Sequence, residues 1–169
     1  VTIIICARNE QGNITACLTS LLKQEYSFEK IQLILINDAS TDLTVQIAES
    51  ILKKSKIDYK IITNKTHKGK KQSITYALGL ANHELIVLRD ADTFTSSNQW
   101  LSTIVSFYKS TNADLIIAPI GIANHSVLLW ALQAIENNIL TVFACGSSYY
   151  KSPFLCNGAN LVFTKTIFE

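Results

Sequence analysis

Two carboxylates, Asp90 and Asp92, follow a short apolar run at 85–88 and are separated only by Ala91. Two negative charges this close repel each other, so either a cation lies between them or one of them holds a proton. Carboxylate oxygens in a short loop suit Mg²⁺ or Mn²⁺, which proteins bind through one or two carboxylates together with phosphate oxygens. The segment therefore predicts a divalent-ion site, with an exposed acidic turn as the alternative.

Two other apolar runs also end in polar residues. The first leads into ARNE at 7–10, and the second, at 31–37, leads into Asp38. Asp38 is open to two roles, a structural one or the acceptance of hydrogen bonds from a ligand such as a base N–H or sugar hydroxyls. Helix capping accounts for the polar residues that follow it, since short polar side chains and carboxylates suit the start of a helix: Ser40, Thr41 and Asp42.

Two further segments are candidates for ligand binding. NKTHKGKK at 64–71 has four lysines and a histidine around Gly69 and leads into a helical pattern. It is either a solvated loop or, beside a helix N-terminus, an anion site. CNGAN at 156–160 is either a plain turn or the lining of a sugar-sized pocket. Neither the P-loop spacing nor a G-x-G-x-x-G after the first strand is present.

The elements that position these segments alternate along the chain. Near-continuous apolar runs predict buried strands at 2–7, 31–37, 58–63, 84–89 and 114–119. Stripes at helical spacing lie between them, at 13–24, 43–54, 74–81 and 100–109. This alternation predicts an α/β fold with a doubly wound, mostly parallel sheet flanked by helices. Ligands of such sheets bind beyond the carboxyl ends of the strands, where the polar segments converge.

Composition limits the class of protein. The 169 residues are 48% hydrophobic and 17% charged, which excludes disorder and favours a single domain. A net charge of +2 predicts no nucleic-acid partner. The four cysteines lack metal-site or disulfide spacing and are expected to be small buried residues in a reducing, cytoplasmic compartment: Cys6, Cys17, Cys145 and Cys156.

The apolar stretch 126–146 is interrupted by Gln133, Glu136 and two asparagines. A membrane span needs about 20 mostly apolar residues, so the stretch predicts a buried or interfacial helix. Its Trp130 and Phe143 are candidates for contact with the cytoplasmic face of a membrane in the full-length protein.

Four segments in this order resemble the family 2 glycosyltransferases, which have the Rossmann-like GT-A fold of nucleotide-diphospho-sugar transferases. They are TIIICARNEQGNITACLTSLLKQ, LILINDASTDLT, KTHKGKKQSITYALGLANHELIVLRDADT and CNGANLVFTKTIFE. The resemblance implies one GT-A domain over 1–169, with a nucleotide-binding half at 1–95 and the start of an acceptor-binding half at 96–169.

The resemblance also implies roles for residues. Asp92 would bind Mn²⁺ or Mg²⁺ directly, and Asp90 would reach the ribose or a metal-bound water. Nucleotide contacts are expected from Ala7, Arg8, Asn9, Glu10, Asp38, Gly69, Lys70, Asp90 and Ala91. Sugar or acceptor contacts are expected from Asn157, Gly158, Ala159 and Asn160. Arg8 and Arg89 depart from the neutral or apolar residues that are more usual in the family.

The implied reaction is a metal-dependent, inverting transfer of a sugar from a UDP- or GDP-sugar to a saccharide or lipid-linked acceptor. The family's general base is an Asp or Glu downstream of the segment that matches NGAN. Glu169 is the only carboxylate there and does not fit that position. We therefore expect the base beyond Glu169, and little or no transfer by these 169 residues alone.

Two other functions stay open at this point. A strand that ends in D-x-D-x-T also resembles the haloacid-dehalogenase-like phosphatases, in which Asp90 would be the nucleophile and Asp92 the general acid. Their later acidic pair has no match, because Asp114, Glu136 and Glu169 are isolated from one another. A non-catalytic module that binds sugar nucleotides is the second alternative.

Overall fold

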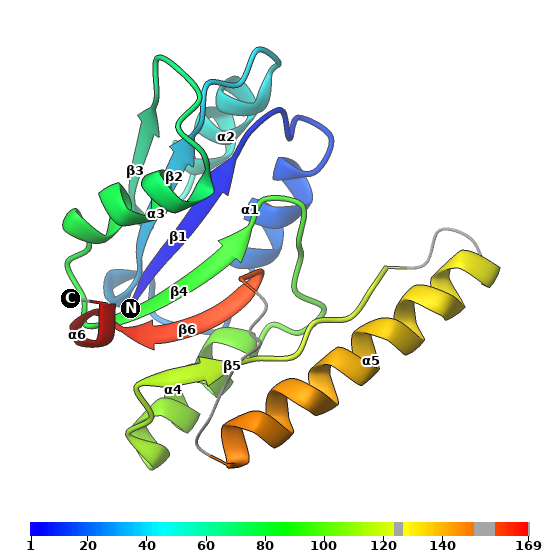
Figure 1. Cartoon of the computed structure of the whole chain (residues 1–169). Helices are drawn as coiled ribbons and strands as arrows, with labels where there is room; N and C mark the ends of the chain where they lie inside the picture. The colour runs from blue at the N-terminus through cyan, green and yellow to red at the C-terminus, as the bar shows by residue number, and fades with distance from the viewer. Residues whose placement is uncertain (124–126, 151–157, 169) are drawn as a thin grey trace.

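The computed structural model describes residues 1–123, 127–150 and 158–168. Its centre is a six-stranded sheet in the order β3-β2-β1-β4-β6-β5 (Figure 1). Four strands are parallel: β1 (Thr2–Ala7), β2 (Gln32–Asn37), β3 (Asp58–Thr63) and β4 (Leu85–Asp90). β6 (Asn160–Thr164) is antiparallel to β4 and to β5 (Leu115–Ile117). The predicted mostly parallel sheet is confirmed.

Helices cover both faces of the sheet, as the doubly wound prediction requires (Figure 1). Successive side chains of a strand point to opposite faces. Ile3 and Ile5 of β1 accordingly pack in one core with α1 (Ile14–Leu22), α2 (Thr44–Leu52) and α4 (Trp100–Thr111). Ile4 packs in a second core with α3 (Lys70–Gly79). The short helices η1 (Phe28–Lys30) and α6 (Lys165–Phe168) complete the elements around the sheet.

The sequence did not predict β6, whose register places Arg89 of β4 opposite Asn160. The chain leaves β5 at the carboxyl edge of the sheet, passes through α5 (Val127–Tyr149) and enters β6 at that same edge. A strand that begins at the carboxyl edge must run antiparallel to β4. This path brings the segment at 158–160 beside the ends of the parallel strands.

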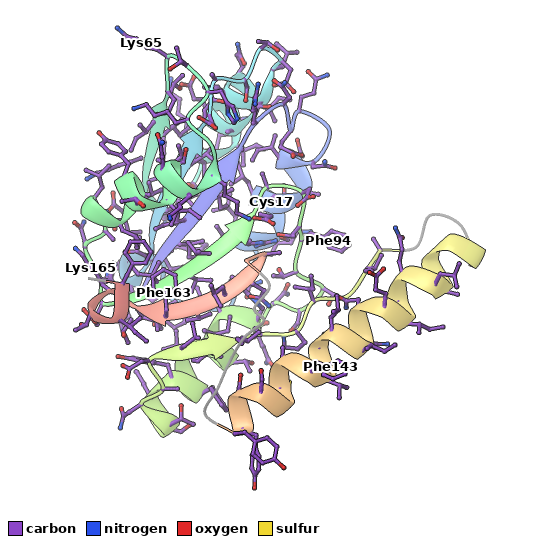
Figure 2. All side chains as sticks on the ribbon, in the orientation of Figure 1. Cys17, Lys65, Phe94, Phe143, Phe163 and Lys165 are labelled. Atoms are coloured by element: carbon purple, nitrogen blue, oxygen red, sulfur yellow. The ribbon has the colours of Figure 1, made fainter. Side chains whose placement is uncertain are left out.

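The long helix α5 lies apart from the sheet, alongside the segment that follows β5 (Figure 1). Of the two predicted alternatives, a buried or an interfacial helix, the buried one is wrong, because several apolar side chains of α5 are exposed, among them Val142 at 71% and Phe143 at 58%. Figure 2 labels Phe143 on this helix. Cys145, also on α5, is exposed, contrary to the prediction that it is buried. Cys17 is buried and Cys6 is half-buried. Cys156 and the side chain of Trp130 lie outside the described residues.

Among the described residues, none of the helices combines the length and the hydropathy that crossing a membrane requires.

Candidate functional site

The loops that follow β1 and β2 interlock at the carboxyl edge of the sheet. The Asn9 amide N–H donates to Ser40 Oγ at 3.0 Å, and the Thr41 N–H donates to Asn9 Oδ1 at 2.9 Å. Asn9 has a positive φ of 56°, which asparagine tolerates better than most residues. The predicted convergence of polar segments at this edge is confirmed for these two loops.

The capping roles predicted for Ser40 and Thr41 are wrong, because both residues bind the β1 loop instead. Asp42 alone acts at the start of α2, where its Oδ1 accepts the Thr44 N–H at 3.0 Å. Its other oxygen accepts the Gln11 N–H at 3.0 Å. Burial would by itself raise the pKa of Asp42, but the hydrogen bonds from Thr44 and Gln11 together outweigh it and lower the pKa.

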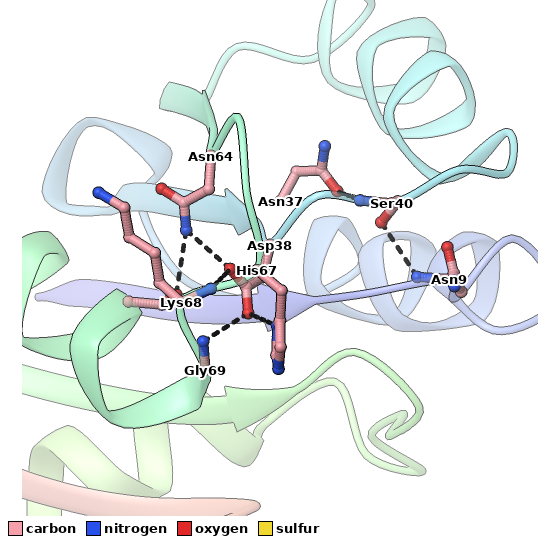
Figure 3. A network of polar contacts seen from close by, with 9 residues as sticks. Asn9, Asn37, Asp38, Ser40, Asn64, His67, Lys68 and Gly69 are labelled. Carbon is pink, nitrogen blue, oxygen red and sulfur yellow. Dashed lines mark hydrogen bonds and ion pairs between the residues drawn. The ribbon is translucent and has the colours of Figure 1, made fainter.

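Asp38 is buried, 4% exposed, and holds the segment that joins β3 to α3 (Figure 3). Its Oδ1 accepts the Asn64 side-chain amide at 2.9 Å and the Lys68 N–H at 2.8 Å. Its Oδ2 accepts the Gly69 N–H at 2.9 Å and lies 2.6 Å from His67 Nδ1. Both oxygens are thus engaged within the chain, which gives Asp38 a structural role in this structure. Its contact with the nucleotide stays a prediction.

Burial of Asp38 would by itself raise its pKa. The hydrogen bonds from Lys68, Asn64, Gly69 and His67 outweigh burial and hold the pKa well below its usual range. Asp38 is therefore a fixed negative charge beneath a segment rich in lysine, and it fixes the backbone of that segment against the carboxyl end of β2.

Gly69, at the start of α3, adopts φ +85° and ψ 158°, a conformation that is essentially limited to glycine. No atom lies within 4 Å of a Cβ placed there, so any cost of a side chain comes from the backbone alone. We expect Gly69→Ala to lower the free energy of unfolding by about 1–3 kcal/mol, measured by urea denaturation.

Gly79→Ala, in the same helix, is the matched control. A Cβ at Gly79 also meets no atom within 4 Å, and its φ is not positive. This variant should leave stability unchanged or raise it by up to about 1 kcal/mol, because alanine reduces the entropy of the unfolded chain. Equal effects of the two variants would contradict a backbone role for Gly69.

A positive charge lies beside Asp90, because Nζ of Lys70, the first residue of α3, forms an ion pair with Asp90 Oδ1. Both side chains are partly exposed, at 48% for Lys70 and 32% for Asp90. The segment between β3 and α3, which Asp38 anchors, thus crosses the end of β1 and places the Lys70 ammonium group at the end of β4. The sequence predicted a divalent ion at the acidic pair, which stays a prediction, and it did not predict the ion pair of Lys70 with Asp90.

A tight turn sets the position of Asp92. The Thr93 hydroxyl and N–H both donate to the Asp90 carbonyl, at 2.7 and 3.3 Å. Ala91 is buried beneath the turn, and Asp92 is exposed. Among the described residues Asp92 has no hydrogen-bond or ion-pair partner, so its carboxylate faces solvent beside the Asp90–Lys70 pair.

Arg89 supports the same turn, a role that could not be predicted from the sequence. It is 3% exposed, donates to the Thr93 hydroxyl and carbonyl at 3.1 and 3.0 Å, and donates to Ser20 Oγ at 2.9 Å. Its guanidinium lies over the Trp100 ring, 5.2 Å from the centroid. Trp100 in turn donates to Asn160 Oδ1 at 3.2 Å. These contacts connect the turn after β4 with α1, α4 and β6.

Asn160 is buried, and both ends of its amide are used within the chain, since its Nδ2 donates to the Pro119 carbonyl at 3.2 Å. In this structure it fixes the segment after β5, and its contact with a sugar or acceptor stays a prediction. Gly158 lies beside Lys70, the partner of Asp90, because a Cβ added to it would lie 3.5 Å from Lys70 Nζ. Ala159 is buried, and Asn157 lies outside the described residues.

The remaining predicted nucleotide contacts come from the end of β1. Ala7 is buried and its carbonyl accepts the Asp38 N–H at 2.9 Å. Arg8 is exposed at the carboxyl edge. Glu10 accepts the Asn13 side-chain amide at 2.8 Å. Of these side chains, Arg8 is therefore the one placed to meet a ligand without breaking a contact within the chain.

The residues present fit a phosphate-bridged divalent ion better than an ion held by protein alone. No group of three or more His, Cys, Asp or Glu side chains suitable for a metal occurs among the described residues. Mg²⁺ and Mn²⁺ sites that include substrate phosphates need only one or two carboxylates. Asp90 and Asp92 meet that requirement, and the α3 N-terminus beside them suits phosphate.

Asn64, His67 and Asn37 contribute to this edge without having been singled out as site residues. Asn37 Oδ1 accepts the Ser40 N–H at 3.1 Å, and Asn64 reaches Asp38 (Figure 3). Asn37 and Asn64 lie at the carboxyl ends of β2 and β3. A polar residue at the end of an apolar strand is also the feature that pointed to Asp90, so the same pattern could have identified both asparagines.

An α/β sheet of this order with a polar carboxyl edge is the architecture of GT-A glycosyltransferases. S. aureus TarS 1-349 is similar with a TM-score of 0.66 and 25% identity, covering 74% of this chain and 37% of that one. The mannosyltransferase PcManGT from Pyrobaculum calidifontis, solved with GDP-Man and Mn²⁺, covers 99% of this chain with a TM-score of 0.76, but at 18% identity it supports the fold alone.

The chain belongs to glycosyl transferase family 2, whose model matches residues 2–169. An uncharacterized glycosyltransferase from Haemophilus influenzae is 34% identical over 66% of this chain and 33% of its own length. The poly-beta-1,6-N-acetyl-D-glucosamine synthase of Staphylococcus aureus is 26% identical over 80% of this chain and 32% of its own length. The chain thus spans about a third of these curated relatives. Membership in this family sets the phosphatase alternative aside.

Proposed function

We propose that this chain binds the donor of a metal-dependent, inverting glycosyltransferase, and that the donor is a UDP- or GDP-sugar. The observation that carries the proposal is the meeting of Asp90, Asp92, Lys70 and the N-terminus of α3 at the carboxyl edge of a GT-A sheet. Crystal structures of the similar TarS contain UDP or UDP-GlcNAc, which supports a nucleotide-sugar donor.

Each part of this edge suits a part of such a donor. The α3 N-terminus presents free backbone N–H groups, and Lys70 adds a positive charge, so both attract a diphosphate. Exposed Arg8, at the end of β1, is placed for the base or ribose. Asp92 and Asp90 would hold the divalent ion, which when bound neutralises charge on the leaving diphosphate.

In the proposed transfer, the acceptor oxygen forms a bond to the anomeric carbon from the face opposite the diphosphate. The bond between that carbon and the phosphate oxygen breaks, and its electron pair goes to the diphosphate. The acceptor proton goes to a general base, a role that we assign to none of the described carboxylates. Lys70 and the α3 N-terminus stabilise the diphosphate charge that develops in this step.

Thermal unfolding with UDP, GDP and their sugars, with and without Mn²⁺, tests the proposal. A ligand that binds only the folded state raises Tm, so we expect a Tm increase that needs both a nucleotide sugar and the ion. A rise with the nucleotide sugar but no sugar transfer or hydrolysis, even in the full-length protein, would support the non-catalytic module. No response to any nucleotide would overturn the proposal.

A further inference from the structure

Arg89 is a buried cation for which the described residues offer no counter-charge. It is 3% exposed and takes part in no ion pair among those residues. Its Nη1 atom is buried and has no hydrogen-bond partner in the same part of the chain. Burying a charge without an ionic partner is costly, and a buried donor without an acceptor adds to that cost. An apolar side chain would avoid both costs, so stability alone does not account for an arginine at this position.

The direction of the Arg89 side chain follows from its place in β4. Successive residues of a strand point to opposite faces of the sheet. Val87 lies in the core with α1 and α4, whereas Leu88 lies in the core with α3. Arg89 accordingly reaches Ser20 of α1 at 2.9 Å, while Asp90 forms its ion pair on the α3 side. Arg89 therefore supports the turn after β4 from the face opposite to the ion pair.

The forked guanidinium group of Arg89 holds Thr93 at two points. Its Nε donates to the Thr93 hydroxyl at 3.1 Å, and its Nη2 donates to the Thr93 carbonyl at 3.0 Å. The same hydroxyl donates to the Asp90 carbonyl at 2.7 Å and so closes the turn. Nη2 also donates to Ser20 Oγ, which accepts the Thr95 N–H at 3.2 Å, so the chain after the turn is fixed as well. A lysine lacks this fork, because its ammonium group is a single point of charge.

The Trp100 ring supplies part of the missing counter-charge. The Arg89 guanidinium carbon lies 5.2 Å from the ring centroid. The face of an aromatic ring carries negative charge density and attracts a cation, most strongly where water is excluded. Trp100 is itself fixed, because its Nε1 donates to Asn160 Oδ1 at 3.2 Å. The guanidinium group therefore has a defined position without a carboxylate partner.

The position of Asp92 depends on this support. Asp92 is exposed and has no hydrogen-bond or ion-pair partner within the described part of the chain. The turn that Thr93 closes and Arg89 holds therefore sets where the Asp92 carboxylate lies. A ligand-binding constellation works only when its groups are held within about 0.5 Å of the productive geometry.

We propose that Arg89 is a positioning residue for the divalent ion: by holding Thr93 it fixes the turn that carries the Asp92 carboxylate. The inference rests on the proposed function, because the ion is part of that proposal. It gives a role to an arginine that departs from the neutral or apolar residues more usual in the family.

Arg89→Leu tests this by isothermal titration calorimetry with UDP- and GDP-sugars. In Mn²⁺ we expect binding to weaken about 10- to 100-fold, the usual loss when a residue that holds a metal ligand is replaced. In EDTA binding should not change, because the contacts of Arg89 are with α1, α4 and the turn rather than with α3. Leucine removes the buried charge, so Tm without ligand should stay within about 4 °C of the parent value.

Lys109→Leu is the matched control for the loss of a positive charge. Lys109 is exposed in the last turn of α4, and its replacement should change neither Tm nor binding in either condition. A loss in Arg89→Leu that is equal in Mn²⁺ and in EDTA, or no loss at all, would overturn the inference.

Two variants of Thr93 carry the same test if Arg89→Leu does not fold. Thr93→Ser keeps the hydroxyl that links Arg89 to the turn and should keep Mn²⁺-dependent binding. Thr93→Val keeps the shape of the side chain without the hydroxyl and should weaken that binding by at least about 10-fold, with no change in EDTA. Equal Mn²⁺-dependent binding by the two variants would contradict the role of Arg89.

The Asp92→Ala background shows whether Arg89 acts through Asp92. Effects of residues that act through one another do not add, so Arg89→Leu should cause little further loss once Asp92 is alanine. Additive losses would overturn the inference.

The parent protein separates this result from the proposed function. If the parent requires Mn²⁺ for binding and Arg89→Leu binds equally well, the inference on Arg89 fails alone. If the parent shows no Mn²⁺-dependent binding, the inference fails together with the metal-dependent part of the proposed function.

Discussion

Asp38→Asn is expected to lower the free energy of unfolding at pH 7 by about 2–3 kcal/mol, because hydrogen bonds to a charged acceptor are the strong ones. Asp38 is 4% exposed and accepts from the backbone of Lys68 and Gly69 and from the side chain of Asn64. Asparagine keeps the shape of the side chain but loses the charge and one acceptor oxygen. Urea denaturation gives the change in stability, and amide hydrogen exchange at Lys68 and Gly69 reports on the segment itself.

The effect of Asp38→Asn should depend on pH. Because the pKa of Asp38 is depressed in the folded state, its carboxylate stabilises the fold above the unfolded pKa of about 3.9. That contribution is lost as the pH falls through the lower folded pKa. The difference between the parent protein and Asp38→Asn should therefore shrink between about pH 5 and pH 3. A difference of the same size at pH 7 and pH 3 would contradict this account.

Asp58→Asn is the matched control for Asp38→Asn. Asp58 begins β3 at the opposite end of the sheet and is exposed. Replacement of a surface residue of this kind usually changes stability by less than about 0.5 kcal/mol. A comparable loss in both variants would show that the effect comes from net charge and not from the contacts of Asp38.

Buried parallel strands could be predicted from the sequence because both of their faces are covered, so they form continuous apolar runs. The predicted strand at 2–7 coincides with β1, which is buried along most of its length. The strand predicted at 58–63 coincides with β3, but the prediction that it is buried is wrong, because β3 is an edge strand whose residues are exposed or half-buried. β6 begins and ends with polar residues, Asn160 and Thr164, and pairs with β4 only because of the path that the chain takes through α5. That path depends on tertiary structure and leaves no periodic signal in the sequence.

The location of the candidate site could be predicted from the sequence, but the contacts between its residues could not. Topology alone brings the ends of parallel strands to one edge, so Asp38 and Asp90 were found as neighbours of a common site. Which groups they contact depends on how residues 64–70 cross that edge. The structure gives Lys70 to Asp90 and places the backbone of Lys68 and Gly69 on Asp38. Sequence spacing holds no information on that crossing.

Asp92→Ala is expected to weaken nucleotide-sugar binding by at least about 10-fold when Mn²⁺ is present, because the loss of even an outer-shell partner of a metal ligand typically costs about 10- to 100-fold. The same variant should change binding little in EDTA. Asp92 is exposed and has no hydrogen-bond or ion-pair partner among the described residues, so the fold should keep its stability within about 0.5 kcal/mol. Isothermal titration calorimetry with UDP- and GDP-sugars measures both conditions, and Asp58→Asn is the charge-matched control.

Variants of Asp90 and Lys70 test the same prediction in a second way. Asp90→Asn removes a carboxylate oxygen that is proposed to bind the metal and also frees Lys70 from its ion pair, so Mn²⁺-dependent binding should fall while binding in EDTA holds or rises. Lys70→Ala removes a charge that attracts the diphosphate directly and should weaken binding in both conditions. Equal losses for Asp92→Ala with and without Mn²⁺ would mean that Asp92 touches the nucleotide rather than the ion. The metal-dependent part of the proposed function would then be wrong, while donor binding at the α3 N-terminus would stand.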